Sequence, residues 1–135
     1  MILYIGGRAQ GKWKLVCGRF GEGCRVADGF IPDTPAEKGE TLILRHAERL
    51  ISADKVSDPE QIGVMAAELA ERIAALEEPG GTVVVVSREM GCGVIPADEK
   101  DMMEREAAGR LQIEIAGRSE EVIRVVCGIG VRLGQ

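Results

Sequence analysis

The apolar residues of this chain follow two patterns, short unbroken runs and longer stretches with a helical spacing. The runs at residues 2–5 and 82–86 predict buried strands, and residues 121–127, where Glu121 and Arg124 interrupt the apolar residues, are expected to form another strand. The run at 82–86 is Thr followed by four Val residues, which is typical of a central parallel strand covered on both faces. We expect a shorter edge strand at 24–27, and a turn with a hairpin arm at 128–133.

The clearest helical stretch begins near residue 58. Its apolar residues recur at steps of three and four and form one face, which comprises Ile62, Met65, Leu69, Ile73 and Leu76. Asp58 is the expected N-cap and Pro59 the expected first helical residue. Two further helices are predicted over residues 11–18 and 98–116.

Strands that alternate with helices predict an α/β fold, with a mostly parallel sheet and helices on both faces. The length of 135 residues fits one domain that spans residues 1–135. Ligands bind at the carboxyl ends of the strands in such sheets. The loops at residues 6–12 and 89–96 both follow predicted strands, so we expect both at that edge.

A phosphate-binding motif follows the first predicted strand directly. The spacing G-x-x-x-x-G-K is formed by Gly6, Gly7, Arg8, Ala9, Gln10, Gly11 and Lys12. Glycines let the backbone N–H groups turn inward around phosphate oxygens, and Lys12 adds a positive charge. We therefore predict a P-loop (kinase-like) fold that binds a nucleotide, GTP or ATP, with these residues. The alternative is a glycine-rich turn without a ligand.

Trp13 occupies the position where the motif has Ser or Thr to hold Mg²⁺. An indole ring offers only a hydrogen-bond donor and cannot coordinate a cation. Trp13 is expected to pack at the first helical turn, with a stacking platform or a steric block as the alternatives. Any Mg²⁺ needs other ligands. Glu89, just past the buried strand, is a candidate for metal binding or proton transfer, and otherwise a solvated loop residue.

Residues 41–51 contain the only histidine. The apolar run at 41–44 fits either a strand or the start of a helix that continues to residue 51. On such a helix, Arg45 and Arg49 flank His46 and either attract phosphates or form a solvated face. His46 is either a surface or packing residue, or a nucleophile that accepts a nucleotidyl group.

Composition excludes several classes of protein. The formal net charge of −5 argues against a non-specific nucleic-acid binder. No apolar run approaches the length of a membrane span, and the N-terminus lacks the pattern of a secretory signal, so we expect a cytoplasmic protein. None of the four cysteines forms a C-x-x-C pair, and no zinc site is expected. The cysteines are expected to be reduced core or loop residues. For Cys92, which lies between two glycines, a reactive thiol is the alternative.

Four segments resemble one enzyme family. Residues 85–96, V-V-S-R-E-M-G-C-G-V-I-P, are similar to the N-E-V-G-x-G-I-V-P segment of the bifunctional adenosylcobinamide kinase / adenosylcobinamide-phosphate guanylyltransferase family. Residues 108–110 match the start of its A-G-R-x-N-Q motif, and residues 125–131 resemble its terminal V-x-G-I-G. The opening M-I-L-Y-I-G-G resembles its M-I-L-x-x-G-G.

The resemblance implies a P-loop enzyme of cobalamin biosynthesis that assembles as an oligomer. Family members phosphorylate adenosylcobinamide and then transfer GMP from GTP to that phosphate through a guanylylated histidine. The chain departs from the family at Trp13, where the family has Ser, and at Gln112 and Ile113, where it has Asn-Gln. It is also shorter across residues 14–80, which hold that histidine in the family, so His46 is not aligned to it by motif.

We therefore expect a compact transferase that binds GTP at the loop and transfers a phosphoryl or guanylyl group to a corrinoid, with His46 as the nucleophile. The alternative is a nucleotide-binding or regulatory relative that has lost turnover.

Overall fold

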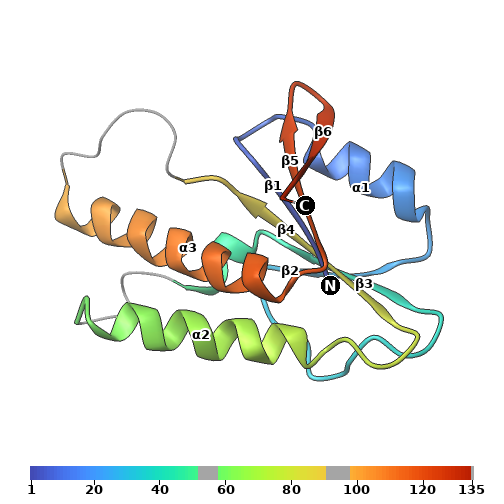
Figure 1. Cartoon of the computed structure of the whole chain (residues 1–135), viewed down its shortest axis with the longest axis horizontal. Coiled ribbons are helices and arrows are strands. Elements are labelled where there is room, and N and C mark those ends of the chain that lie inside the picture. Colours follow the sequence, from blue (N-terminus) through green and yellow to red (C-terminus); the bar gives the residue numbers. More distant parts are fainter. Residues whose placement is uncertain (52–57, 91–97, 135) are drawn as a thin grey trace.

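The computed structural model describes residues 1–51, 58–90 and 98–134. Figure 1 shows the elements along the chain. In order they are β1 (Ile2–Gly6), α1 (Lys12–Phe20), β2 (Arg25–Asp28), β3 (Thr41–Arg45), the 3₁₀ helix η1 (Ala47–Leu50), α2 (Gln61–Ala74), β4 (Thr82–Arg88), α3 (Glu99–Arg118), β5 (Glu121–Val126) and β6 (Ile129–Leu133).

The six strands form one sheet in the order β2-β3-β4-β1-β5-β6. All neighbouring pairs are parallel except β5 and β6, which form an antiparallel hairpin. The register places Gly6 beside Arg88, and Asp28 beside Arg45, at the carboxyl ends of their strands. The predicted α/β fold is confirmed, and the valine run at 82–86 lies in a central strand with both neighbours parallel.

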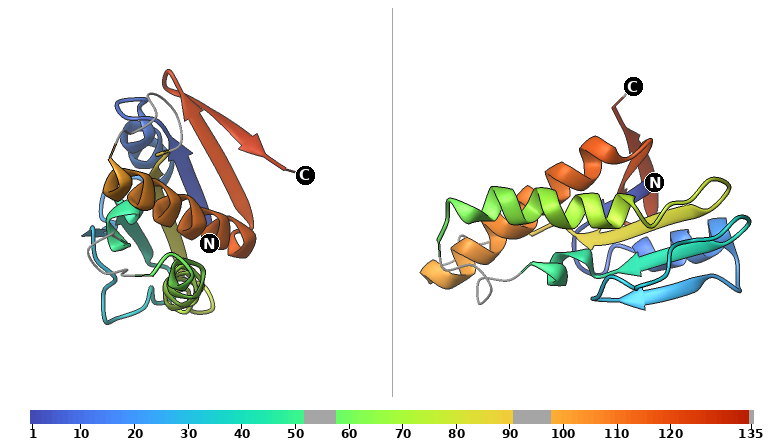
Figure 2. Two further views of the ribbon diagram at one scale, coloured as in Figure 1. Left: turned by 90° about the vertical axis from the view of Figure 1, so that its left-hand side faces the viewer. Right: turned by 90° about the horizontal axis from the view of Figure 1, so that it is seen from below.

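Helices cover both faces of the sheet, as predicted (Figure 2). On one face, α2 and α3 pack over the alternate strand residues Leu3, Leu42, Leu44, Val83 and Val85. On the other face, Val16 of α1 packs over Ile2, Tyr4, Ile43, Val84 and Val86. This alternation follows from the two-residue period of a strand, which sends successive side chains to opposite faces. Aliphatic residues are therefore buried on both sides of the sheet.

Several predicted boundaries differ from the structure. Helix α1 continues past Gly18 to Phe20, because the conformation that ends it is adopted by Gly21, with φ of 75° and its N–H bonded to the Cys17 carbonyl at 2.9 Å. Helix α2 begins at Gln61. Asp58 accepts a hydrogen bond from the Glu60 N–H at 3.0 Å and so caps the turn that precedes the helix.

The ambiguity at residues 41–51 is resolved by strand pairing. Strand β3 lies between β2 and β4 and continues through Arg45, and only residues 47–50 are helical. The interpretation that places Arg45, His46 and Arg49 on one helix is wrong, because the hydrogen bonds of Arg45 belong to the sheet. The predicted helix at 98–116 is present as α3, and Asp98 caps it by accepting from the Lys100 N–H at 2.8 Å.

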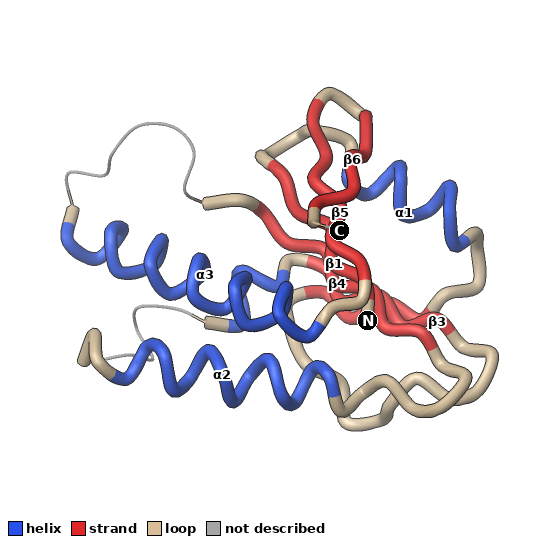
Figure 3. The backbone as a smooth tube through the Cα atoms, viewed as in Figure 1, coloured by secondary structure: helices blue, strands red, loops and turns tan. Residues whose placement is uncertain are grey.

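The loop between β1 and α1 and the turn of the β5–β6 hairpin lie side by side (Figure 3). Within the part of the chain that the structure describes, every helix is too short or too polar to serve as a membrane-crossing segment.

Candidate functional site

The loop at residues 6–12 is shaped by two glycines that admit no side chain. A Cβ on Gly6 would overlap the carbonyl oxygen of Val125 in β5. Gly11 has φ of 90°, and its Cβ would lie 3.1 Å from the Cα of Gly128. The backbone of β5 and its turn therefore presses against the loop, and only glycine fits at both contacts.

Gln10 fixes the other side of the loop to the same hairpin. Its side-chain oxygen accepts a hydrogen bond from the Cys127 N–H at 2.8 Å, and its carbonyl accepts from the Gly128 N–H at 2.8 Å. Cys127 and Gly128 both have positive φ, which forms the tight turn between the two strands. The hairpin thus acts as a brace for the predicted phosphate loop.

Lys12 points into the loop that precedes it. Its ammonium donates to the carbonyl oxygens of Gly6 at 2.9 Å and Gly7 at 2.6 Å. Burial lowers the pKa of Lys12, and the charge of Arg88 adds to that effect, whereas Glu48 and Glu89 oppose it. The ammonium is therefore held over the loop with part of its hydration removed, where a phosphate would restore its charge balance.

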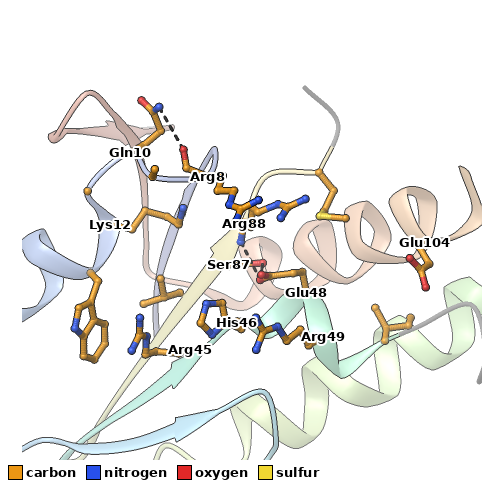
Figure 4. A pocket seen from close by; sticks show the side chains of 16 residues that line it. Arg8, Gln10, Lys12, Arg45, His46, Glu48, Arg49, Ser87, Arg88 and Glu104 are labelled. Carbon is orange, nitrogen blue, oxygen red and sulfur yellow. Dashed lines mark hydrogen bonds between the residues drawn. The ribbon is translucent and has the colours of Figure 1, made fainter. Parts of the chain in front are cut away.

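A cleft of about 910 Å³ opens beside the loop, at the carboxyl ends of β1, β3 and β4. Its lining includes the basic residues Arg8, Lys12, Arg45, Arg49 and Arg88. The two carboxylates in the lining are Glu48 and Glu104. Figure 4 shows the loop residues on one side of the cleft and Arg45, His46 and Arg49 on the other. A site with this excess of positive charge, in a chain of net charge −5, suits a polyanion.

His46 lies in the cleft directly after β3. Its backbone is left-handed, with φ of 53°, and this turns the chain from the strand into η1. Nδ1 contacts the Asp28 carboxylate at the end of the neighbouring strand β2. Since a carboxylate only accepts, Nδ1 carries the proton, and Nε2 of the neutral ring keeps its lone pair. This hydrogen bond lowers the pKa of Asp28.

Arg45 and Trp13 form a stacked pair at the edge of the cleft. The guanidinium carbon lies 4.0 Å from the centroid of the indole ring, in the range of a cation–π contact. Trp13 also packs against the core cluster under α1, so its ring has a firm support. The expected packing role of Trp13 and the alternative of a stacking platform therefore occur together.

A network of polar side chains positions Glu48. Its carboxylate accepts from the Arg88 N–H at 2.9 Å and from the Ser87 hydroxyl at 3.4 Å. Gln112, which is buried in α3, donates to the Ser87 oxygen at 2.9 Å and to the Arg88 carbonyl at 2.6 Å. Gln112, at a position where the chain departs from the family motif, thus holds the end of β4 by hydrogen bonds.

Glu89 does not line the cleft. Its carboxylate accepts from Arg124 of β5 at 3.3 and 3.4 Å, and its N–H donates to the Gly6 carbonyl at 2.9 Å. Its suggested role in metal binding or proton transfer stays a prediction. The loop at 91–96, including the candidate thiol of Cys92, lies outside the described residues.

Sequence reasoning missed Asp28, Glu48 and Arg88 as members of the site. A signal for Asp28 was present, because it directly follows the edge strand predicted at 24–27 and the ends of parallel strands share one edge of the sheet. Glu48 and Arg88 had no such signal, since their places depend on the 3₁₀ turn and on the length of β4.

Comparison with known proteins identifies the relatives of this chain. Residues 36–133 match the family described as cobinamide kinase / cobinamide phosphate guanyltransferase. The chain is 37% identical over 67 residues to the bifunctional adenosylcobalamin biosynthesis protein CobU of Escherichia coli, a match that covers 50% of this chain and 37% of that protein. It is 36% identical over 83 residues to the Salmonella typhimurium protein of the same description, with 57% and 46% covered. These matches span less than half of either relative. The family match covers most of the chain, which therefore belongs to the cobinamide kinase / cobinamide phosphate guanyltransferase family.

Proposed function

We propose that this protein binds GTP with its phosphates at residues 6–12 and transfers the guanylyl group to a phosphorylated corrinoid through His46. The observation that carries the proposal is the juxtaposition in one cleft of the phosphate loop and a histidine whose Nδ1 is held by a carboxylate. Family membership supplies the substrate class, a cobinamide phosphate.

The proposed transfer has two displacements. Nε2 of His46 attacks the α-phosphorus of GTP, a P–N bond forms, and the bond to the β-phosphate oxygen breaks to release pyrophosphate. A phosphate oxygen of the corrinoid then attacks the same phosphorus, and the P–N bond breaks to regenerate the imidazole. Asp28 stabilises the positive charge that the ring acquires in the first step.

The cleft is large enough for the nucleotide but not for a whole corrinoid. A volume of about 910 Å³ is that of a small-molecule site and accommodates a nucleotide. A corrinoid is much larger, so only its phosphate-bearing arm would enter, while the ring system would lie outside. The basic lining would neutralise the phosphates of both substrates.

Guanylylation of the enzyme tests the proposal directly. The protein is incubated with GTP, and intact-mass measurement with peptide mapping locates an acid-labile GMP adduct, which we expect on His46. His46→Ala should abolish the adduct. Asp28→Asn should slow its formation on the order of 100-fold, because the ring loses its oriented tautomer. The matched control is Asp33→Asn, an exposed carboxylate outside the cleft.

Two results would contradict the proposal. An adduct that persists in His46→Ala would exclude His46 as the nucleophile. Saturable GTP binding without any adduct, and without product from a cobinamide phosphate acceptor, would favour the alternative of a relative that binds nucleotide without turnover.

Phosphoryl transfer to a corrinoid hydroxyl is the second candidate activity. It is favoured by the position of Lys12, whose ammonium lies over the loop where the outer phosphates would sit. Incubation of ATP or GTP with adenosylcobinamide, with the product detected by mass, tests this step separately from guanylylation. No phosphorylated product, in a preparation that forms the adduct, would exclude it.

A further inference from the structure

In a phosphate loop, the residue after the lysine normally coordinates Mg²⁺. In this chain that residue is Trp13, which cannot coordinate a metal ion. The motif provides a hydroxyl at this position to coordinate Mg²⁺. Trp13 provides an indole, which has no lone pair to offer a cation. The family resemblance implies Mg²⁺, but the donor at this place in the cleft does not fit it.

The group that faces this position is itself a cation. The Arg45 guanidinium lies over the Trp13 ring, at 4.0 Å from its centroid, and both residues line the cleft. A divalent cation placed beside them would be repelled by Arg45. Mg²⁺ requires oxygen ligands, which neither side chain provides.

Glu48, one of the two carboxylates in the lining of the cleft, is already engaged. One oxygen of Glu48 accepts hydrogen bonds from the Arg88 N–H and the Ser87 hydroxyl. Across residues 1–51, 58–90 and 98–134, no group of three or more His, Cys, Asp or Glu side chains is arranged to hold a metal ion. The chemistry of the side chains that line the cleft thus favours anions over cations.

Arginine side chains take the place of the metal charge. Arg8 and Arg88 also line the cleft, and within the described part of the chain neither forms an ion pair with a carboxylate. A guanidinium binds phosphate with two parallel N–H donors, and a stacked guanidinium is oriented before the ligand arrives. Stacking on Trp13 therefore prepares Arg45 for this role.

We infer that the cleft binds the triphosphate of a nucleotide without Mg²⁺, and that Arg45, held on Trp13, supplies the positive charge in its place. This inference rests on the proposed function, because it assigns the charge partner of the same nucleotide. It concerns binding of the phosphates and assigns no bond-breaking step.

Calorimetric titration of GTP into the full chain tests the inference, once with EDTA and once with excess Mg²⁺. We expect saturable binding in EDTA, with a Kd within about threefold of the value in Mg²⁺. Binding that occurs only with Mg²⁺ overturns the inference and leaves nucleotide binding intact. No binding in either buffer overturns the proposed function, and the inference falls with it.

Variants separate the guanidinium from its platform. Arg45→Ala should weaken binding in EDTA at least about tenfold, the effect of one lost charge-assisted contact. Trp13→Ala should weaken it less, because the charge remains but its orientation is lost. The matched control is Arg72→Ala, an exposed arginine of α2 outside the cleft, which should bind as the parent does. Unchanged binding by Arg45→Ala would overturn the inference.

The double substitution Trp13→Ser with Arg45→Ala reverses the arrangement. It restores the hydroxyl of the motif and removes the cation that repels a metal. We expect Mg²⁺ to strengthen GTP binding by this variant at least about fivefold, in contrast to the parent protein. Circular dichroism of each variant verifies that the fold is kept, and an equal response of both proteins to Mg²⁺ would count against the inference.

Discussion

The two sides of the cleft differ in what forms them, backbone on one side and side chains on the other. The loop side, residues 6–12, is made of backbone, and its shape is set by Gly6 and Gly11 against the hairpin. The opposite side is made of side chains at the ends of β3 and β2, where Arg45 stacks on Trp13 of α1 and His46 contacts Asp28. The first side has no room for a side chain at Gly6 or Gly11, whereas the second depends on which groups face each other.

This difference separates binding from chemistry. A backbone cradle gives the same hydrogen bonds to any triphosphate, so the loop alone selects a class of ligand. The side-chain half carries His46, the proposed nucleophile, and the charges that distinguish one reaction from another. Mutations in the first half should therefore damage stability and binding together, and those in the second should change function with the fold intact.

Gly6→Ala is the strongest test of the backbone side. The added methyl group would overlap the Val125 carbonyl, which is backbone and cannot rotate away. We expect a loss of about 3 kcal/mol in the free energy of unfolding, measured in urea, together with loss of nucleotide binding. The matched control is Gly7→Ala, whose Cβ would make only an ordinary 3.5 Å contact with Gln10. Equal stability of the two variants would show that β5 does not shape the loop.

Gln112→Ala tests the support of the side-chain half from below. It removes the donor to the Ser87 hydroxyl and to the Arg88 carbonyl, in a buried position. We expect a loss of about 2 kcal/mol in the free energy of unfolding. Glu48 should also shift, because it accepts a hydrogen bond from the same Ser87 hydroxyl. Its neighbour Ile113, which is 68% exposed, provides the control, since Ile113→Ala should change stability by less than about 0.5 kcal/mol. An unchanged free energy of unfolding for Gln112→Ala would show that these hydrogen bonds do not stabilise the fold.

The smallest effect is expected from pH and involves Lys12. Its pKa is lowered in the free protein, and a bound phosphate should raise it again. Above the lowered pKa, binding must take up a proton, so affinity should fall several-fold as pH rises toward the ordinary lysine value. Inorganic triphosphate is the preferred probe, since guanine itself titrates at alkaline pH.

The sign of the stability effect is opposite in the free protein. Because the unfolded chain holds the Lys12 proton to higher pH, stability should rise slightly over the same interval. Lys14→Met, which removes an exposed lysine two residues away, should keep both trends. If Lys14→Met abolished them, the titrating group would not be Lys12.

The same contrast explains what could be predicted from the sequence. The glycine spacing at 6–12 encodes a backbone shape, so the loop could be predicted from local pattern. The α/β fold could be predicted from the alternation of strands and helices. The run at 82–86 likewise required a central strand. The pairing of His46 with Asp28, and of Arg45 with Trp13, depends on β3 ending at Arg45. That end is set by pairing with β2 and β4, which an isolated apolar run at 41–44 does not encode.

The brace between Gln10 and the turn at Cys127 and Gly128 also has a consequence for biosynthesis. Gln10 and Cys127 are separated by 117 residues, so the loop at residues 6–12 cannot be braced until the chain has been synthesised past this turn. Contacts of such long range form late in folding. A nascent or truncated chain without this turn would carry the glycine motif but should have no preformed anion site.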